Sequence, residues 1–353
     1  MMKGKYMAYV GSYSYTGKAK GITVYDVDVE KGLFKERCEI EVDNSSYVTV
    51  SHNGRNLYSI ADEGVVSFRI LENGSLSRLN SAKINGMRGC HLSTDEDDRY
   101  IFVSGYHDGK ATILRLNKDG SVGPIVDGVF HKGYGSVAER NFRPHVSCTR
   151  MTPDKRFVMA ADLGIDQVRI YRFDEEKLVQ VDAIRCERES APRHFRFSND
   201  GRFMYLMYEL KNVIDVYSYQ TGERAPKIEK IQTISTIGDK KYSELTAACA
   251  MRLSPDPDNQ YVYCTNAGDN TLAIYRRDKN SGLLEMISCL PVSGDYPKDV
   301  VIFPDEKHVA CLNHESSSIS FFSVDYEKGL LVMCGRSIKV NEPNCCAIVK
   351  VSD

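Results

Sequence analysis

Histidines, arginines, a lysine and a glutamate recur along this chain beside short apolar runs. Guanidinium and ammonium groups bind anions, and a neutral imidazole accepts a proton near pH 7. If these side chains converge, they suit a small anionic substrate and acid–base chemistry. One group of candidates stands just before six similar turn-and-strand segments, described below, with one more candidate near the end of the chain. They are Ser46, Tyr47, His91, His145, Arg193, His194, Arg252, Lys298 and Asn344. Those after the strands that follow are Glu63, His107, Asp162, Glu209, Asn266, His314 and Glu315.

Glu209 differs from the others because it interrupts an otherwise apolar run, Phe203-Met-Tyr-Leu-Met-Tyr-Glu-Leu. An isolated carboxylate in such a run would be costly to bury, so it must be paired or functional. Both roles fit the position: Glu209 can neutralise an arginine of the channel wall, or it can move a proton. Isolated histidines such as His107, His131 and His308 are expected to be hydrogen-bonded structural residues.

The elements that must position these residues form a repeat. A polar turn followed by an apolar strand occurs six times, as SHNGRNLYSI (51–60), STDEDDRYIFV (93–103), TPDKRFVMAA (152–161), SNDGRFMYLM (198–207), SPDPDNQYVYC (254–264) and FPDEKHVACL (303–312). A second turn and another strand follow each unit, and the period is roughly 45 to 58 residues. Four short strands in a repeat of this length are typical of a propeller blade.

The two ends of the chain complement each other. The segments 6–13, 21–28 and 38–42 supply three strands of a further blade, and 345–351 supplies the missing first strand. We therefore predict an all-β, seven-bladed propeller of four-stranded antiparallel blades, as one domain over residues 1–353, with almost no helix. Two irregular stretches, near 125–143 and 221–246, are expected to be long loops. In such a ring the inner strands begin at the mouth of one channel, where the candidate residues should meet.

Composition narrows the class of function. With 46 basic and 48 acidic residues the net charge is -2, which argues against a nucleic-acid partner. The first ten residues are too polar for a signal peptide, and no stretch has the length of a membrane span. We expect a cytoplasmic protein whose 11 cysteines are reduced. Without a CxxC pair or an acidic cage, we expect no metal and no cofactor.

Several blocks resemble the propeller-type lactonase family, which includes bacterial 6-phosphogluconolactonases and the fungal carboxy-cis,cis-muconate cyclase. They are GSYSYTGKAKGITVYDVD (11–28), GCHLS (89–93), RPHVSC (143–148), AADLGIDQVRIY (160–171), APRHFRFSNDGRFMYLMYEL (191–210), AACAMRLSPD (247–256) and YPKDVVIFPD (296–305). The resemblance covers the whole chain and implies a metal-free site for a lactone or its open carboxylate. By motif, it places the catalytic residues at His145, Arg193, Glu209 and Arg252, with His91 as another pocket residue.

The chain departs from the family pattern at several polar positions. A His-x-His block reads His145-Val-Ser147 here, an acid two residues before Arg252 is Ala250, and an arginine in the next loop is Ala267. A Pro-Arg-Asp block has become Pro297-Lys298-Asp299. These losses suggest a substrate whose anion is smaller or differently placed.

Three functions follow as hypotheses. The leading one is a metal-free lactonase acting on a sugar-acid lactone, in which His145 or Glu209 takes a proton from water while Arg193 and Arg252 hold the anion. His91, His194, Lys298 and His314 would contribute to substrate binding. The alternatives are a cycloisomerase for a muconate-like dicarboxylate, and a non-catalytic sugar-acid sensor or scaffold. The expected partner is a small anionic molecule, without nucleic acid or membrane; the oligomeric state stays open.

Overall fold

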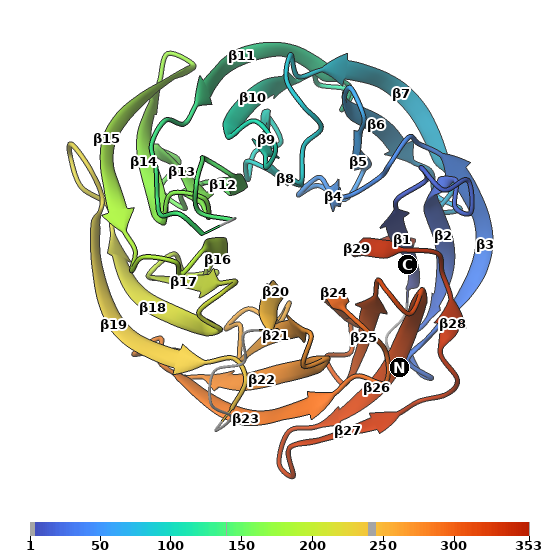
Figure 1. Cartoon of the computed structure of the whole chain (residues 1–353). Coiled ribbons are helices and arrows are strands. Elements are labelled where there is room, and N and C mark those ends of the chain that lie inside the picture. Colours follow the sequence, from blue (N-terminus) through green and yellow to red (C-terminus); the bar gives the residue numbers. More distant parts are fainter. Residues whose placement is uncertain (1–3, 139, 239–244, 353) are drawn as a thin grey trace.

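The computed structural model describes residues 4–138, 140–238 and 245–352, which form seven sheets around a central axis (Figure 1). Each sheet is a blade with four antiparallel strand positions, and in one blade the outer position is divided between two short strands; the described residues contain no helix. The predicted seven-bladed propeller is therefore confirmed. The alternation of apolar and polar residues produces short strands, and the turns between them keep neighbouring strands antiparallel.

The strands share four positions within the blades. The inner strands are β4 (Val48–Val50), β8 (His91–Thr94), β12 (Val146–Met151), β16 (Pro192–Phe197), β20 (Ala247–Leu253), β24 (Pro297–Ile302) and β29 (Pro343–Ser352). The second strands are β5 (Asn56–Ala61), β9 (Tyr100–Gly105), β13 (Phe157–Asp162), β17 (Phe203–Tyr208), β21 (Tyr261–Ala267), β25 (His308–Asn313) and β1 (Lys5–Ser12). The third strands are β6 (Gly64–Ile70), β10 (Lys110–Leu116), β14 (Gln167–Asp174), β18 (Val213–Gln220), β22 (Thr271–Arg277), β26 (Ser318–Asp325) and β2 (Gly21–Asp28). The outer strands are β7 (Leu76–Lys83), β11 (Val122–Phe130), β15 (Lys177–Arg185), β19 (Lys227–Ser235), β23 (Leu284–Pro291), β27 (Leu330–Met333) with β28 (Ile338–Lys339), and β3 (Leu33–Glu41).

The two ends of the chain close the ring. The blade in the order β29-β1-β2-β3 takes its inner strand from the C-terminal end and its other three strands from the N-terminal end (Figure 1). The register runs from Tyr6 opposite Lys350 to Gly11 opposite Cys345. The predicted pairing of 345–351 with 6–13 is thus confirmed. Because the blade is shared, the second strand β1 is paired on both sides, with β29 and β2, and is not left with an open edge.

The six repeated units are turns with a common backbone. In each, an amide donates to the carbonyl three residues earlier, as from Lys155 to Thr152 (2.9 Å) and from Gly201 to Ser198 (2.8 Å). The amide donors occupy the left-handed backbone region, which explains their residue types; they are Gly54, Asp98, Lys155, Gly201, Asn259 and Glu306.

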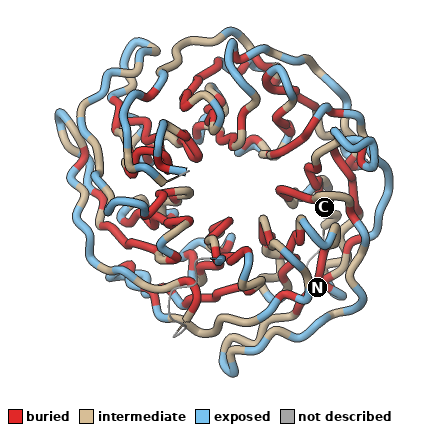
Figure 2. Tube along the Cα trace, in the orientation of Figure 1, coloured by how far each residue is buried: buried red, intermediate tan, exposed pale blue. Residues whose placement is uncertain are grey.

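The core lies between the blades. The second strands are almost entirely buried, and exposure rises toward the outer strands (Figure 2). Apolar clusters join adjacent blades all round the ring; in one, the rings of Phe34 and Phe303 stack at 5.3 Å between the closing blade and its neighbour. Burying one such ring contributes about 1.5–3 kcal/mol, so the blade contacts hold the ring together.

The prediction of two long loops is wrong for a part of each stretch, because residues 125–130 and 227–235 belong to outer strands. The first is strand β11 up to Phe130, followed by a loop that leads to β12. Of the second, residues 227–235 form β19, and residues 239–244 lie outside the described part of the chain. The strand alternation of β19 is weak because it is an outer strand with few buried positions.

Candidate active site at the mouth of the channel

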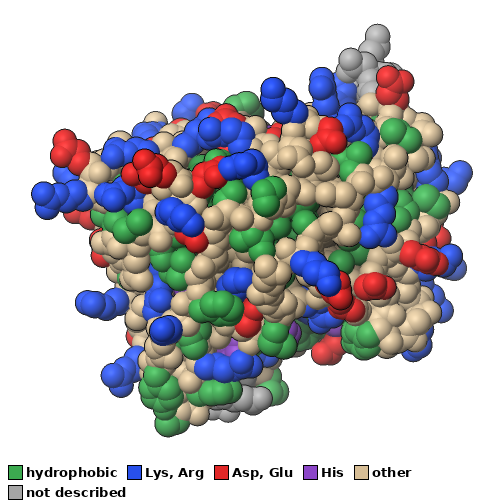
Figure 3. All heavy atoms as spheres, turned by 90° about the horizontal axis from the view of Figure 1, so that it is seen from above, with side chains coloured by type: hydrophobic (Ala, Val, Ile, Leu, Met, Phe, Trp, Pro, Cys, Tyr) green, Lys and Arg blue, Asp and Glu red, His purple; other side chains and the backbone are tan. Residues whose placement is uncertain are grey.

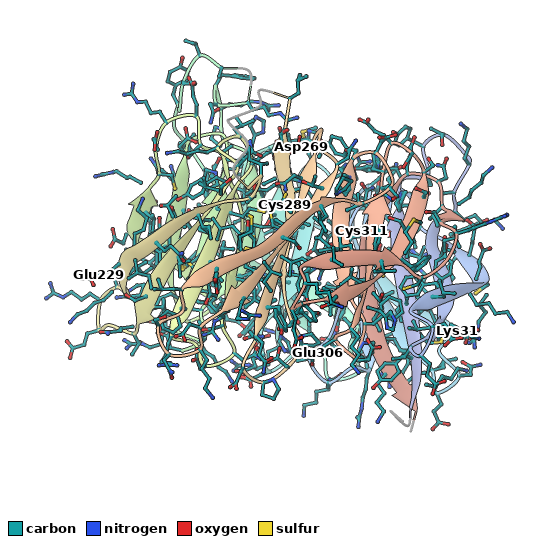
Figure 4. All side chains as sticks on the ribbon, turned by 90° about the horizontal axis from the view of Figure 1, so that it is seen from below. Lys31, Glu229, Asp269, Cys289, Glu306 and Cys311 are labelled. Carbon is teal, nitrogen blue, oxygen red and sulfur yellow. The ribbon has the colours of Figure 1, made fainter. Side chains whose placement is uncertain are left out.

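The propeller has two ends with different turns. Figure 4 shows Asp269, in the turn between β21 and β22, and Glu306, in the turn between β24 and β25, at opposite ends of the strands. The inner strands begin at the end marked by Asp269 and finish at the end marked by Glu306. A residue near the beginning of an inner strand therefore faces a different end of the channel from one near its finish.

A β-bulge interrupts five of the seven inner strands near their beginnings. In β16, Pro192 pairs with Tyr208 and His194 with Met207, so Arg193 is the extra residue between them. The same shift makes Lys298 the extra residue in β24. Bulges leave a residue unpaired and re-aim its side chain, which is why they are frequent beside active sites. The described bulges of this kind leave out Ser147, Arg193, Cys249, Lys298 and Asn344.

Four of these five bulge residues line one cavity of about 100 Å³ at this end. Its lining is Tyr13, Ser46, Tyr47, Cys90, Arg193, His194, Cys249, Ala250, Lys298, Asp299 and Asn344. The fifth bulge residue, Ser147, donates from its hydroxyl to the carbonyl of Arg193 (2.8 Å) and fixes that backbone. The cavity is thus built from several blades at once.

Three of the inner strands that line the cavity begin with the same local backbone pattern. Each begins with a proline, which has no N–H to give to the sheet and is therefore suited to the first position of a strand. The residues before these prolines have left-handed backbone, which costs roughly 1–3 kcal/mol for a residue other than glycine; they are Ala191 (φ 56°), Tyr296 (φ 58°) and Glu342 (φ 44°). The residues after the prolines are Arg193, Lys298 and Asn344.

Glu209 lies behind the cavity wall and is held between two arginines. Its side chain is buried and forms ion pairs with Arg193 and with Arg140, which comes from the loop before β12. Arg193 also donates through Nε to the carbonyl of Cys249 (2.8 Å). The guanidinium of Arg193 is therefore fixed on two sides. The carboxylate of Glu209 is paired, which is one of the two roles expected for it from its apolar surroundings.

Lys298 is the most perturbed cation of the cavity. Its Nζ lies over the rings of Tyr13 (5.4 Å) and Tyr296 (5.8 Å) and forms no ion pair with a described residue. Burial, and next the charge of Arg193, lower the pKa of Lys298 to about 8. Burial and the charge of Lys298 also lower the pKa of His314 to about 4. His314 packs edge-on against Tyr13 and is neutral at pH 7.

Two further lining residues bear on the chemistry. The side-chain amide of Asn344 is buried, and neither its oxygen nor its nitrogen has a hydrogen-bond partner among the described residues. Such an amide is available to a ligand in the cavity.

Burial raises the pKa of the Cys90 thiol to about 12, so this cysteine is not a thiolate nucleophile at neutral pH.

His145 lies beside the cavity and does not line it. Its ring stacks on Tyr106 at 4.3 Å, and Nδ1 donates to the carbonyl of Tyr106 (2.6 Å). A carbonyl can only accept, so the proton is on Nδ1 and Nε2 is free to accept another. Burial lowers the pKa of His145, which keeps the ring neutral at pH 7.

His91 and His194 stand deeper in the channel, their rings 5.2 Å apart. Burial, and then neighbouring arginines, lower the pKa of both rings well below the usual range. The Nε2 of His91 accepts from Arg150 (3.2 Å), so His91 is neutral with its proton on Nδ1. Only His194 of this pair lines the cavity.

The expected position of Arg252 at this mouth is wrong. Arg252 is the sixth residue of β20, and five steps along a strand carry it about 16 Å from the strand's beginning. It lines a separate cavity toward the other end of the channel, and Asp299, which lines the mouth cavity, binds it through both oxygens (3.0 and 2.6 Å). The motif that contains Arg252, AACAMRLSPD (247–256), leads into the turn after the inner strand β20. That turn lies at the end of the channel opposite the mouth cavity.

Arg140 and Tyr296 are site residues that the sequence reasoning missed. Arg140 lies in a loop without a repeat signal, so nothing in the sequence connects it to Glu209. Tyr296 could have been found from the sequence, because it is the first residue of the second of three similar blocks. These are Ala191-Pro-Arg, Tyr296-Pro-Lys and Glu342-Pro-Asn. The recurrence of a proline before a polar residue marks the beginning of an inner strand.

Within residues 4–138, 140–238 and 245–352, no three His, Cys, Asp or Glu side chains are grouped so that they could hold a metal ion. This finding does not test the activity, so the expected absence of a metal stays a prediction. In the same part of the chain, no helix has the length and apolar composition needed to cross a membrane.

Comparison with known proteins gives consistent results. A family model described as a lactonase with a 7-bladed β-propeller matches residues 7–348. The chain is 30% identical over 347 residues to a 6-phosphogluconolactonase of Bacillus subtilis, with 97% of each chain covered. It is 32% identical over 300 residues to an uncharacterized protein of Staphylococcus epidermidis, covering 83% of this chain and 85% of that one. The solved structure of a periplasmic gluconolactonase from Pseudomonas aeruginosa superposes with a TM-score of 0.89 at 27% identity, covering 98% and 99% of the two chains.

Proposed function

Because the chain belongs to the seven-bladed β-propeller lactonase family, we propose that it hydrolyses the lactone of a small anionic sugar acid without a bound metal ion. One observation carries this proposal: the mouth cavity places the cations of Arg193 and Lys298 beside the unpartnered amide of Asn344. A lactone whose acid group is a carboxylate or a phosphate offers oxygens to all three groups.

The cations act on the substrate and on the charge that develops during reaction. When water adds to the lactone carbonyl, negative charge collects on the carbonyl oxygen. Fixed donors at that oxygen stabilise it by about 3–4 kcal/mol each in a dry site. Arg193 is suited to this task because Glu209 and the carbonyl of Cys249 hold its guanidinium in place. Glu209 is thus a positioning residue.

His145 is the better acceptor for the proton of the attacking water. Its Nε2 is free and unprotonated at neutral pH, whereas the carboxylate of Glu209 forms ion pairs with two arginines. The proton taken from water then passes to the ring oxygen as the ester C–O bond breaks, which leaves the open hydroxy acid. For this step the substrate must extend from the cavity toward the ring of His145, which stacks on Tyr106.

Acid release from δ-gluconolactone and from its 6-phospho derivative tests this function directly. A pH dye in weak buffer should report hydrolysis well above the uncatalysed rate with at least one of them, and Arg193→Gln should abolish most of it. If neither lactone is hydrolysed faster, the proposal fails. A change in the ultraviolet absorbance of a muconate-type dicarboxylate would then indicate a cycloisomerase, and no reaction at all would indicate a binding propeller.

The pH profile tests Lys298. Because its pKa is about 8 and it acts as a cation, kcat/KM should fall as the pH rises through about 8. Lys298→Arg should move this fall to higher pH, since a guanidinium keeps its charge. The uncatalysed alkaline hydrolysis of the lactone must be subtracted at each pH. A rise of kcat/KM through pH 8 would instead make Lys298 a base.

Chelation tests metal independence. After dialysis against EDTA, the lactonase activity should be unchanged, because the proposed roles belong to His145, Arg193 and Lys298. A heat-inactivated sample gives the background rate. Loss of activity that is restored by adding back a divalent ion would overturn this part of the proposal.

A further inference from the structure

A second cavity, larger than the first, lies toward the other end of the channel. Its volume is about 330 Å³, and its polar lining includes the side chains of Arg150, Arg196 and Arg252. These arginines come from β12, β16 and β20, three successive inner strands. Of the residues around the mouth cavity, only Tyr47 also lines this one, so the two cavities are distinct.

The three arginines occupy one repeated position. Each stands two residues before the Ser or Thr of the turn that ends the inner strand, in Arg150-Met-Thr-Pro-Asp, Arg196-Phe-Ser-Asn-Asp and Arg252-Leu-Ser-Pro-Asp. The equivalent residues of three other blades, which line the same cavity, are Thr49, Ser93 and Val301. The positive charge is thus concentrated on one side of the channel.

Most of this charge has no carboxylate partner. Asp299 neutralises Arg252 alone, and no Asp or Glu is among the residues that line this cavity. Arg150 donates only to the neutral ring of His91, and its Nε is buried without a partner. The guanidinium of Arg196 forms no hydrogen bond or ion pair with a described residue.

The lack of a partner for Arg196 is reflected in the pKa of its guanidinium. Burial, and then the charge of Arg150, lower the pKa of Arg196 to about 10. An arginine normally keeps its charge well above this value, so the protein itself does not stabilise the cation. Half-buried charges without partners are destabilising, and the presence of two of them, Arg150 and Arg196, in one cavity indicates that a ligand supplies the missing negative charge.

We propose that this cavity binds a small tetrahedral dianion, either inorganic phosphate or the phosphate group of a monoester. Guanidinium groups match the paired oxygens of phosphate, and Arg150 and Arg196 carry the two charges that a dianion neutralises. Arg150 and Arg196 also line an adjoining cavity, whose lining includes the exposed residues Lys155 and Glu96. On the side of the ring drawn in Figure 3, basic and acidic side chains are interspersed.

The test measures binding of inorganic phosphate and of glycerol 3-phosphate by calorimetry, together with melting temperature, at constant ionic strength. Wild type should bind at least one of them and melt at a higher temperature in its presence. Arg196→Gln should weaken binding at least 10-fold and should not lower the melting temperature without ligand, because it removes an unpaired, half-buried charge. Arg172→Gln on the exposed part of β14 removes the same charge and should change neither property.

Arg193→Gln in the mouth cavity distinguishes this site from the proposed active site. If Arg193→Gln abolishes phosphate binding while Arg196→Gln retains it, the phosphate binds at the mouth and the proposal is wrong. It is also wrong if wild type binds neither probe, or if succinate binds as tightly as phosphate. Tighter binding of glycerol 3-phosphate than of phosphate identifies a monoester site, and the reverse order identifies a site for the free ion.

Discussion

A chain that ends at Glu342 is expected to show no cooperative thermal unfolding, because the whole ring depends on β29. This strand provides the inner edge of the closing blade and pairs with β1 from Tyr6 to Ser12. Cys345 and Cys346 on it are completely buried, against neighbouring blades on either side. Removing it opens the ring and exposes two blade faces, a loss comparable with the roughly 5–15 kcal/mol total stability of a typical protein.

Differential scanning calorimetry of the truncated and full chains measures this effect. The matched control is a circular permutant that joins the original termini by a short Gly/Ser linker and opens between Lys279 and Asn280, an exposed turn between β22 and β23. The permutant changes the chain ends but keeps every strand, and it should melt close to the full chain. A truncated chain with an unchanged melting temperature would show that β29 does not close the ring.

Glu209→Gln is expected to lower stability by about 3 kcal/mol, within the range found when a buried ion pair loses one partner. The amide keeps the size of the side chain but leaves Arg193 and Arg140 without their shared carboxylate. Because Arg193 is then less well fixed, KM should rise, whereas kcat should change much less. Melting temperature and steady-state kinetics of the one variant give all three quantities.

Two controls make this result specific. Arg140→Gln removes the more exposed of the two arginines and should cost less stability than Glu209→Gln. Arg193→Gln loses a charge-assisted contact with the substrate, worth about 1.5–3 kcal/mol, so kcat/KM should fall by about 10- to 100-fold. If Glu209→Gln depresses kcat strongly while KM and melting temperature stay unchanged, then Glu209 moves a proton and is not a positioning residue.

The blades could be predicted from the sequence because their signals are local. Alternating apolar residues specify short strands, and a repeated polar turn such as Thr152-Pro-Asp or Ser198-Asn-Asp separates them. The count of strands at the two ends then required that 345–351 complete the first blade. Residue types also indicated a cationic site, and the place of Glu209 in an apolar run indicated that its carboxylate is paired or functional.

The tertiary structure decided which of these residues meet. A bulge shifts the register at Arg193 and Lys298 and turns both side chains into the mouth cavity, and the bulge depends on pairing with the neighbouring strand. The partner of Glu209 includes Arg140 from a loop of another blade, a contact with no periodic signal. Arg252, chosen by motif, lines the opposite cavity because a few steps along an inner strand carry a side chain from one end of the channel to the other. Local sequence therefore specifies the strands, whereas register and the packing of separate blades determine the site.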